Sequence, residues 1–136
     1  MKELLHLVIL TPYGRYFEGD VSFVQVCSEK YSLGILPNHA PLISTIDICK
    51  MIIKMNGKEI IHAIGGGIIN VDSEKTTLIL NSVERSDEID KERAEQAKKR
   101  AEERLKQKAT DDAIDVNRAK LALLRAINRL KVVDGD

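Results

Sequence analysis

Short apolar runs alternate with polar residues from Leu4 to about Ser82. Alternation with a period of two is typical of strands that bury one face. It occurs in Leu5-Leu7-Ile9, in Met51-Ile53-Met55 and in Leu78-Leu80, which alternates with Thr77-Ile79-Asn81. Asn56-Gly57 follows the second run and is typical of a type I′ hairpin turn. Because no stretch of helical length separates these runs, residues 1–84 predict a small antiparallel β-sandwich.

The pattern changes after Ser82, because residues 83–133 contain no Gly, Pro or aromatic residue. Ala94, Ala97, Ala101 and Leu105 recur every three or four residues, which predicts a helix with a narrow apolar stripe as far as Lys108. Thr110, Asp111 and Asp112 are candidate N-caps of a second helix. That helix carries Ile114, Ala119, Ala122, Leu123, Ala126, Ile127 and Leu130. We therefore predict an α+β chain in which residues 85–136 form an antiparallel two-helix hairpin.

The predicted hairpin buries mainly alanine methyl groups. A buried Leu or Ile stabilises a fold by about 1.5 to 3 kcal/mol, and a methyl group contributes far less. A weakly held, highly charged hairpin is suited to changing the surface on which it docks. We interpret residues 85–136 as the moving part of the chain.

Composition and charge narrow the function classes. The chain has 136 residues with 21 basic and 21 acidic side chains, so its zero formal charge does not favour nucleic acid or an anionic membrane as partner. Its apolar runs are much shorter than the roughly 20 residues that span a bilayer, which favours a cytosolic protein without membrane insertion. Cys27 and Cys49 lack a CxxC spacing and a nearby His cluster, which favours two buried thiols over a redox or metal site.

Four segments carry a family likeness. They are residues 33–42 (LGILPNHAPL), 65–71 (GGGIINV), 77–80 (TLIL) and 118–130 (RAKLALLRAINRL). Together with the two-part pattern, they make the chain resemble the epsilon subunits of bacterial F-type ATP synthases over nearly its whole length. The resemblance implies a non-catalytic rotor subunit, bound peripherally at the cytoplasmic face of the plasma membrane. Its implied partners are the gamma subunit, the c-ring and, in an extended inhibitory state, the beta subunits.

The resemblance implies that residues 32–42, here called the signature segment, attach the sandwich to gamma and the c-ring. The implied contact residues are Ser32, Leu33, Pro37, His39, Pro41 and Leu42. Pro37 and Pro41 are also interpretable as rigid turn residues. A metal-binding or catalytic His39 is disfavoured, because His6 and His62 belong to other strands. The glycines at 65–67 are not followed by Gly-Lys-Ser/Thr, so we predict a bulge or a close backbone approach rather than a phosphate loop.

Residues 89–94 (IDKERA) are similar to the motif through which some bacterial epsilon subunits bind ATP as a regulatory ligand. An apolar Ile89 and a small Ala94 can flank a purine, and the Asp90 carboxylate can accept a hydrogen bond from the adenine amino group. Spacings of seven and four place Arg93, Arg100 and Arg104 on one helix face and Arg118, Arg125 and Arg129 on another. The candidate ATP ligands are Glu84, Ile89, Asp90, Arg93, Ala94, Arg100, Arg125 and Arg129.

Two alternatives stay open for these residues. Asp90 is a typical helix N-cap, and the arginines can pair with Glu92, Glu95, Glu102 and Glu103, which would leave purely structural or inhibitory helices. The resemblance also implies that Arg118, Arg125 and Arg129 meet the beta subunits in the extended state. No nucleophile and base come together in the sequence, so an enzyme is disfavoured. A coiled-coil adaptor is disfavoured because the apolar stripe is too short.

Overall fold

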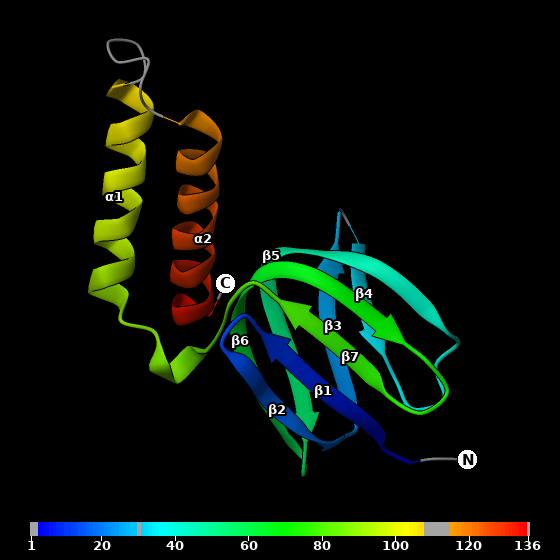
Figure 1. The fold of residues 1–136 in the computed structure, drawn as a ribbon. Coiled ribbons are helices and arrows are strands. Elements are labelled where there is room, and N and C mark those ends of the chain that lie inside the picture. Colours follow the sequence, from blue (N-terminus) through cyan, green and yellow to red (C-terminus); the bar gives the residue numbers. More distant parts are fainter. Residues whose placement is uncertain (1–2, 30, 108–114, 136) are drawn as a thin grey trace. The chain divides into compact units, whose positions relative to one another are not determined.

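The computed structural model describes residues 3–29, 31–107 and 115–135 (Figure 1). The chain divides into two compact units, Met1–Arg85 and Ser86–Asp136. The described strands of the first unit are β1 Leu5–Thr11, β2 Gly14–Val21, β3 Phe23–Ser28, β4 Tyr31–Ile35, β5 Leu42–Met55, β6 Lys58–Val71, β7 Thr76–Leu80 and β8 Val83–Arg85. The second unit holds a short 3₁₀ turn, Ser86–Glu88, and the helices α1 Lys91–Gln107 and α2 Val116–Asp134.

The strands form one continuous eight-stranded sheet, which folds into two layers that share β5 and β6 (Figure 1). These two strands have 14 residues each and pair along their whole length. The strand order is β2-β1-β7-β6-β5-β3-β4, with β8 on β6. β7 pairs with the C-terminal half of β6, whereas β8 pairs with its N-terminal half. The ladders are antiparallel except for the parallel pair β1 and β7.

The core lies between these layers and follows the predicted alternation. Leu7 and Ile9 on β1, Met51 on β5 and Leu78 on β7 are completely buried. Ile79, between Leu78 and Leu80, points outward as the alternation predicts, whereas Val8, between Leu7 and Ile9, is also buried. The Asn56-Gly57 turn is also confirmed, because both residues have positive φ, 54° and 75°, and the turn joins β5 to β6 in register.

The three glycines lie where β6 passes from one layer to the other. Gly65 N–H donates to the carbonyl of Ser82 at 2.9 Å, and Asn81 N–H donates to the carbonyl of Gly66 at 2.8 Å. A Cβ on Gly67 would overlap the carbonyl oxygen of Ile79 and lie 3.0 Å from Leu80 Cα. Glycine is therefore required by the close approach of two backbones, as predicted.

The two helices pack antiparallel through small residues. Ala94 and Ala101 on α1 and Ala119 and Ala126 on α2 are almost completely buried. We call these four residues the alanine seam. The open end of the hairpin is closed by Lys91 Nζ, which lies 2.9 Å from Asp134 Oδ1. The predicted hairpin with a seam of small residues is thus present.

The caps of α2 differ from the prediction. Asp115 is the N-cap and accepts the Arg118 N–H at 3.1 Å, while Gly135 ends the helix in the left-handed conformation with φ 81°. Thr110, Asp111, Asp112 and Ile114 lie outside the described residues.

The expectation of two separate buried thiols is wrong. Cys27 on β3 and Cys49 on β5 form a disulfide with a Cα to Cα distance of 6.5 Å. Both residues are only partly buried. The spacing of 22 residues gave no motif in the sequence. The two cysteines become neighbours because β3 and β5 are adjacent strands.

Candidate functional site

The hairpin places arginines beside each residue of the alanine seam. The pairs are Arg93-Ala94 and Arg100-Ala101 in α1, and Arg118-Ala119 and Arg125-Ala126 in α2. Successive residues of an α-helix are about 100° apart, so a residue just before a seam position lies beside the seam. Because the helices are antiparallel, the same offset in both puts all four arginines on one side of the hairpin. We call this side the arginine face.

Two of the candidate phosphate ligands, Arg100 and Arg125, lie at the same height on the arginine face. Arg100 lies nine residues beyond Lys91, and Arg125 lies nine residues before Asp134, so the Lys91–Asp134 ion pair places both at one level. Arg129 is three residues beyond Ala126 and therefore lies on the same side, nearer the seam. Among the described residues of the hairpin, no ion pair joins Arg93, Arg100 or Arg125 to a glutamate.

Asp90 occupies the N-terminal end of α1. Its Oδ1 accepts the backbone N–H of Arg93 at 3.2 Å, and its carbonyl accepts the N–H of Ala94 at 3.0 Å. The carboxylate is exposed and has a second oxygen for a further acceptor role. Asp90 is therefore the helix cap that the alternative interpretation predicted.

The remaining candidate ATP ligands have different surroundings. Ile89 is half-buried immediately before the cap, whereas Ala94 is 1% exposed within the seam and offers little surface to a purine. Glu84 belongs to the first unit, where it lies on β8 opposite Ala63. Asp90, Arg93, Arg100, Arg125 and Arg129 thus all belong to the hairpin, with Asp90 at its open end and Arg100 and Arg125 nine residues along the helices from Lys91 and Asp134.

The signature segment forms the end of β4, a turn and the start of β5. Ser32 and Leu33 lie on β4, Leu42 begins β5, and Pro41 is exposed just before it. The His39 N–H donates to the carbonyl of Leu36 at 3.2 Å, and Asn38 has φ 65°. Proline followed by a left-handed residue is typical of a type II turn, so Pro37 is a turn residue.

His39 is oriented by its own segment. Its Nδ1 lies 2.7 Å from the carbonyl oxygen of Ala40, which can only accept, so Nδ1 carries a proton. A cavity of about 330 Å³ opens beside this segment. It is lined by the start of β1, residues 36 and 38–41, and residues 71–76. The signature segment therefore combines a rigid turn with an adjacent hollow.

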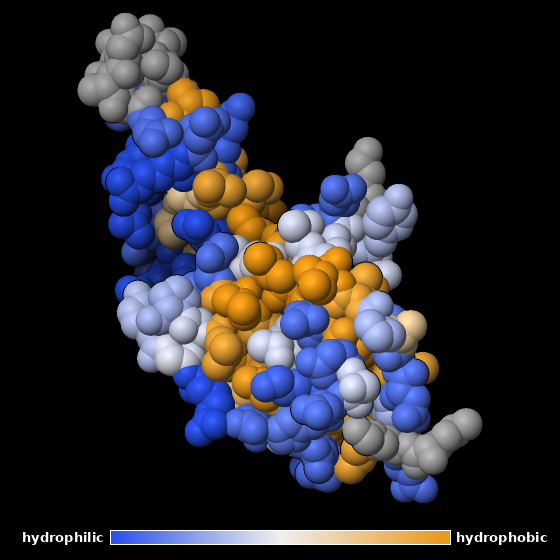
Figure 2. All heavy atoms as spheres, turned by 45° about the vertical axis from the view of Figure 1, so that its right-hand side comes forward, coloured by the Kyte–Doolittle hydropathy of each residue, from blue (hydrophilic) through white to orange (hydrophobic). Residues whose placement is uncertain are grey.

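An apolar stripe that the sequence analysis missed crosses the outer face of the sandwich. Ile68 on β6 and Ile79 on β7 are direct cross-strand partners, 46% and 52% exposed. Ile43 on β5, 75% exposed, pairs with Asn70, two residues from Ile68 and on the same face. Figure 2 shows apolar side chains gathered on the surface of this unit. The sequence did contain a signal for this stripe, because these strands also have apolar residues at outward-facing positions. A strand whose outer face meets only water does not need apolar residues there.

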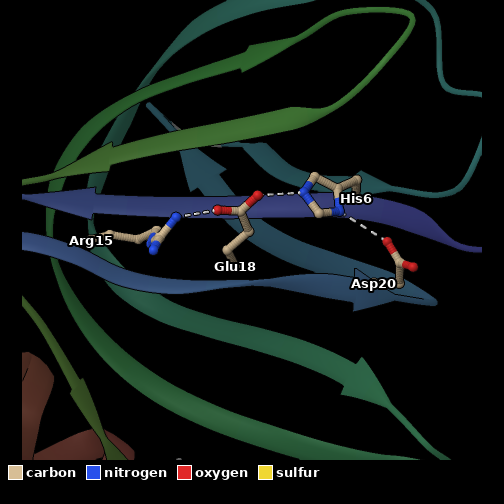
Figure 3. Close-up of polar contacts among 4 residues, drawn as sticks. All are labelled: His6, Arg15, Glu18 and Asp20. Carbon is tan, nitrogen blue, oxygen red and sulfur yellow. Dashed lines mark hydrogen bonds and ion pairs between the residues drawn. The ribbon is translucent and has the colours of Figure 1, made fainter.

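A charged cluster on β1 and β2 was also missed. His6 Nε2 lies 2.8 Å from Glu18 Oε2, and His6 Nδ1 lies 3.0 Å from Asp20 Oδ1 (Figure 3). Arg15 pairs with the other oxygen of Glu18. An ionised carboxylate can only accept, so this geometry favours the doubly protonated form of His6, in which both ring nitrogens donate. The cross-strand register aligns these residues, which single-strand patterns do not reveal.

This cluster predicts a pH effect. Hydrogen bonds to Asp20 and then Glu18 raise the pKa of His6 above its ordinary 6.5, and the hydrogen bond to His6 lowers the pKa of Glu18. The stabilisation from His6 is therefore present below pH 6.5 and is lost as the pH rises through the raised pKa. We expect Asp20→Asn to lower the pKa of His6 in an NMR titration. An unchanged titration midpoint would contradict this cluster.

Neither helix among the described residues is long and apolar enough to cross a bilayer.

Residues 4–86 match the family model of the β-sandwich domain of the ATP synthase delta/epsilon chain, and residues 87–134 match that of its long α-helix domain.

Curated relatives match over nearly their whole length. The ATP synthase epsilon chain of Bacillus licheniformis is 45% identical over 128 residues, which cover 94% of this chain and 96% of the relative. That of Desulforamulus reducens is 38% identical over 134 residues, covering 98% and 100%. A chain in the mitochondrial ATP synthase structure of Euglena gracilis shares the fold, with a TM-score of 0.79, 18% identity, and coverage of 94% of this chain and 80% of that one. The chain belongs to the family of ATP synthase delta/epsilon chains.

Proposed function

We propose that the chain is the epsilon subunit of a bacterial F-type ATP synthase, a non-catalytic rotor subunit that also senses ATP through its hairpin. Its relatives carry the name ATP synthase epsilon chain, and the Euglena structure is one of the F1 head with the c-ring. The sandwich joins gamma to the c-ring at the cytoplasmic face of the membrane. The hairpin limits ATP hydrolysis when it extends toward the beta subunits.

The signature segment is suited to attachment. The Leu36–His39 turn is closed by a backbone hydrogen bond and contains Pro37, whose ring fixes φ, and the half-buried Leu33 and Leu42 flank it on β4 and β5. A preorganised loop binds at a lower entropic cost than a mobile one. The adjacent cavity offers a place for a partner side chain. We therefore assign Ser32, Leu33, Pro37, His39, Pro41 and Leu42 to the contact with gamma and the c-ring.

The arginine face carries the proposal of ATP binding. Arg100 and Arg125 lie at one height on the same side of the seam, with Arg93 and Arg129 beside the seam on that side. Guanidinium groups bind phosphate oxygens through paired hydrogen bonds, so such a cluster suits a triphosphate. Asp90 at the open end accepts the adenine amino group beside Ile89. Glu84, which lies on β8 in the first unit, stays a prediction of the family motif.

ATP binding and inhibition then compete for the same arginines. ATP bridges α1 and α2 in the compact hairpin, which withholds Arg118, Arg125 and Arg129 from the beta subunits. ATP at ten times its dissociation constant shifts the equilibrium by only about 1.4 kcal/mol. The compact and extended states must therefore be nearly balanced without ATP, which agrees with a seam built from alanine.

Calorimetric titration of the full chain tests the ATP site. We expect saturable binding of one ATP per chain. We also expect the Asp90→Ser variant to bind ATP at least fivefold more weakly, a loss of about 1 kcal/mol or more of binding free energy. Serine removes the carboxylate but retains the helix cap. Equal helical circular dichroism of the two proteins is the control. Absence of binding heat at millimolar ATP would refute the site.

A second candidate function is favoured by the N-cap of Asp90. In it the hairpin is purely structural and inhibitory and binds no nucleotide. The same titration separates the two: equal ATP affinity of the Asp90→Ser variant means that Asp90 serves only as a cap. Suppression of the ATPase activity of the assembled enzyme by the full chain is expected in both cases.

A further inference from the structure

The disulfide joins β3 to β5 at a point where the backbone ladder between these two strands has ended. The ladder between β3 and β5 ends at Gln25 and Ile52. Beyond that point, β3 is tied to β5 by the Cys27–Cys49 bridge and by a hydrogen bond of 2.9 Å between the hydroxyls of Ser28 and Ser44. The bridge therefore replaces a missing stretch of ladder.

The segment that the bridge holds is at the edge of the sheet. β4 is the last strand in the strand order, and among the described strands it pairs with β3 alone. Cys27 is the direct cross-strand partner of Ser32 on β4. Edge strands are the elements most easily opened, because a ladder supports them on one side only. The bridge thus fixes one edge hairpin, β3–β4, to the long strand β5.

Neither cysteine is fully buried. Cys27 and Cys49 are intermediate in burial, although Cys49 packs against the core. A disulfide sealed inside the core would be inert, whereas a partly exposed one can undergo thiol–disulfide exchange. The pair is accordingly placed for repeated opening and closing.

We propose that Cys27 and Cys49 form a reversible dithiol–disulfide switch that locks the β3–β4 hairpin to β5 when it is oxidised. One protein thiolate attacks a low-molecular-weight disulfide and releases one thiol. The second protein thiolate then attacks the mixed disulfide and releases the other thiol. The protein loses two protons and two electrons, and the small disulfide gains them as two thiols.

The switch acts on the attachment surface. Ser32 and Leu33, two residues assigned to the contact with gamma and the c-ring, lie opposite Cys27 and Val26 on the hairpin. Oxidation orders this strand before binding, so the oxidised chain binds at a lower entropic cost. The switch does not involve the arginine face, and it stands or falls independently of ATP binding.

Thiol trapping tests the chemistry. The full chain is equilibrated in glutathione buffers of increasing oxidised fraction and alkylated with N-ethylmaleimide. Mass spectrometry of the intact chain then counts the alkyl groups. We expect two populations only, with two alkyl groups or none, and complete reversal by dithiothreitol. Chains that stay doubly alkylated in oxidised glutathione, or that accumulate only glutathione adducts, would overturn the proposal. The double variant Cys27→Ser with Cys49→Ser controls for alkylation of other groups.

Hydrogen exchange tests the lock. We expect the amides of residues 26–28 and 32–34 to exchange at least about tenfold faster in the reduced chain than in the oxidised one, with unchanged exchange in β1 and β7. This comparison uses the wild-type chain, so it does not depend on the folding of a variant. Equal amide exchange of the β3–β4 hairpin in the two forms would mean that the disulfide is only a passive link, and it would refute the switch.

Discussion

Gly67→Ala is expected to destabilise the sandwich by about 3 kcal/mol or more. The added Cβ would overlap the carbonyl oxygen of Ile79, a backbone atom that cannot move without breaking the β6–β7 ladder. Small domains are stable by only about 5 to 15 kcal/mol, so a large share of the stability is at risk. Urea unfolding, followed by the circular dichroism signal of the β-strands, measures the loss of unfolding free energy.

Gly57→Ala is the matched control. Gly57 also has positive φ, 75°, but no atom lies within 4 Å of the position of an added Cβ. The control therefore carries only the conformational cost of a left-handed alanine, about 1 to 2 kcal/mol. If Gly67→Ala lowers the free energy of unfolding by no more than Gly57→Ala does, the inferred close approach of β6 and β7 is wrong.

Arg125→Ala is expected to weaken ATP binding by about ten- to a hundredfold. Hydrogen bonds to charged groups contribute about 1.5 to 3 kcal/mol each, and 1.4 kcal/mol is a factor of ten in affinity. Arg125 is exposed beside Ala126 at the height of Arg100, so its loss removes one of the two arginines that lie at the same level on the arginine face. Calorimetric titration with ATP at fixed ionic strength measures the change.

Lys98→Ala provides the control for charge. Lys98 lies on α1 four residues beyond Ala94, on the side of the seam opposite the arginine face, where it pairs with Glu102 at 3.9 Å. Removing it changes the net charge as much as Arg125→Ala does. We expect ATP affinity to change less than threefold, because exposed ion pairs contribute little. Equal losses in the two variants would show that ATP responds to net charge and not to the arginine face.

The periodic patterns were sufficient to predict most of the strands, the hairpin turn and the two helices. Alternation in residues 5–9, 51–55 and 77–81 predicted strands whose inward residues are the buried ones, because the side-chain period of a strand is local. The Asn56-Gly57 turn and the alanine seam were predictable for the same reason. The start of α2 was misplaced, since Asp115 competes with several capping residues before it in the sequence.

The candidate sites were predictable only in part. Helical spacing placed Arg93 with Arg100 and Arg125 with Arg129, but the antiparallel pairing of α1 and α2 decided that both sets share one side. The cluster of His6, Glu18 and Asp20 depends on cross-strand register, which the local pattern does not specify. The Cys27–Cys49 bridge likewise depends on which strands are neighbours.

The sequence by itself thus determined the two-part α+β organisation, the turns, the glycine requirement and the family, because these depend on local periodicity and on motifs. Tertiary structure decided the strand order, the parallel β1–β7 pair, the disulfide, the histidine cluster and the common side of the arginines. The reason is physical: these features arise from contacts between residues far apart in the chain, and the adjacency of strands and helices sets them.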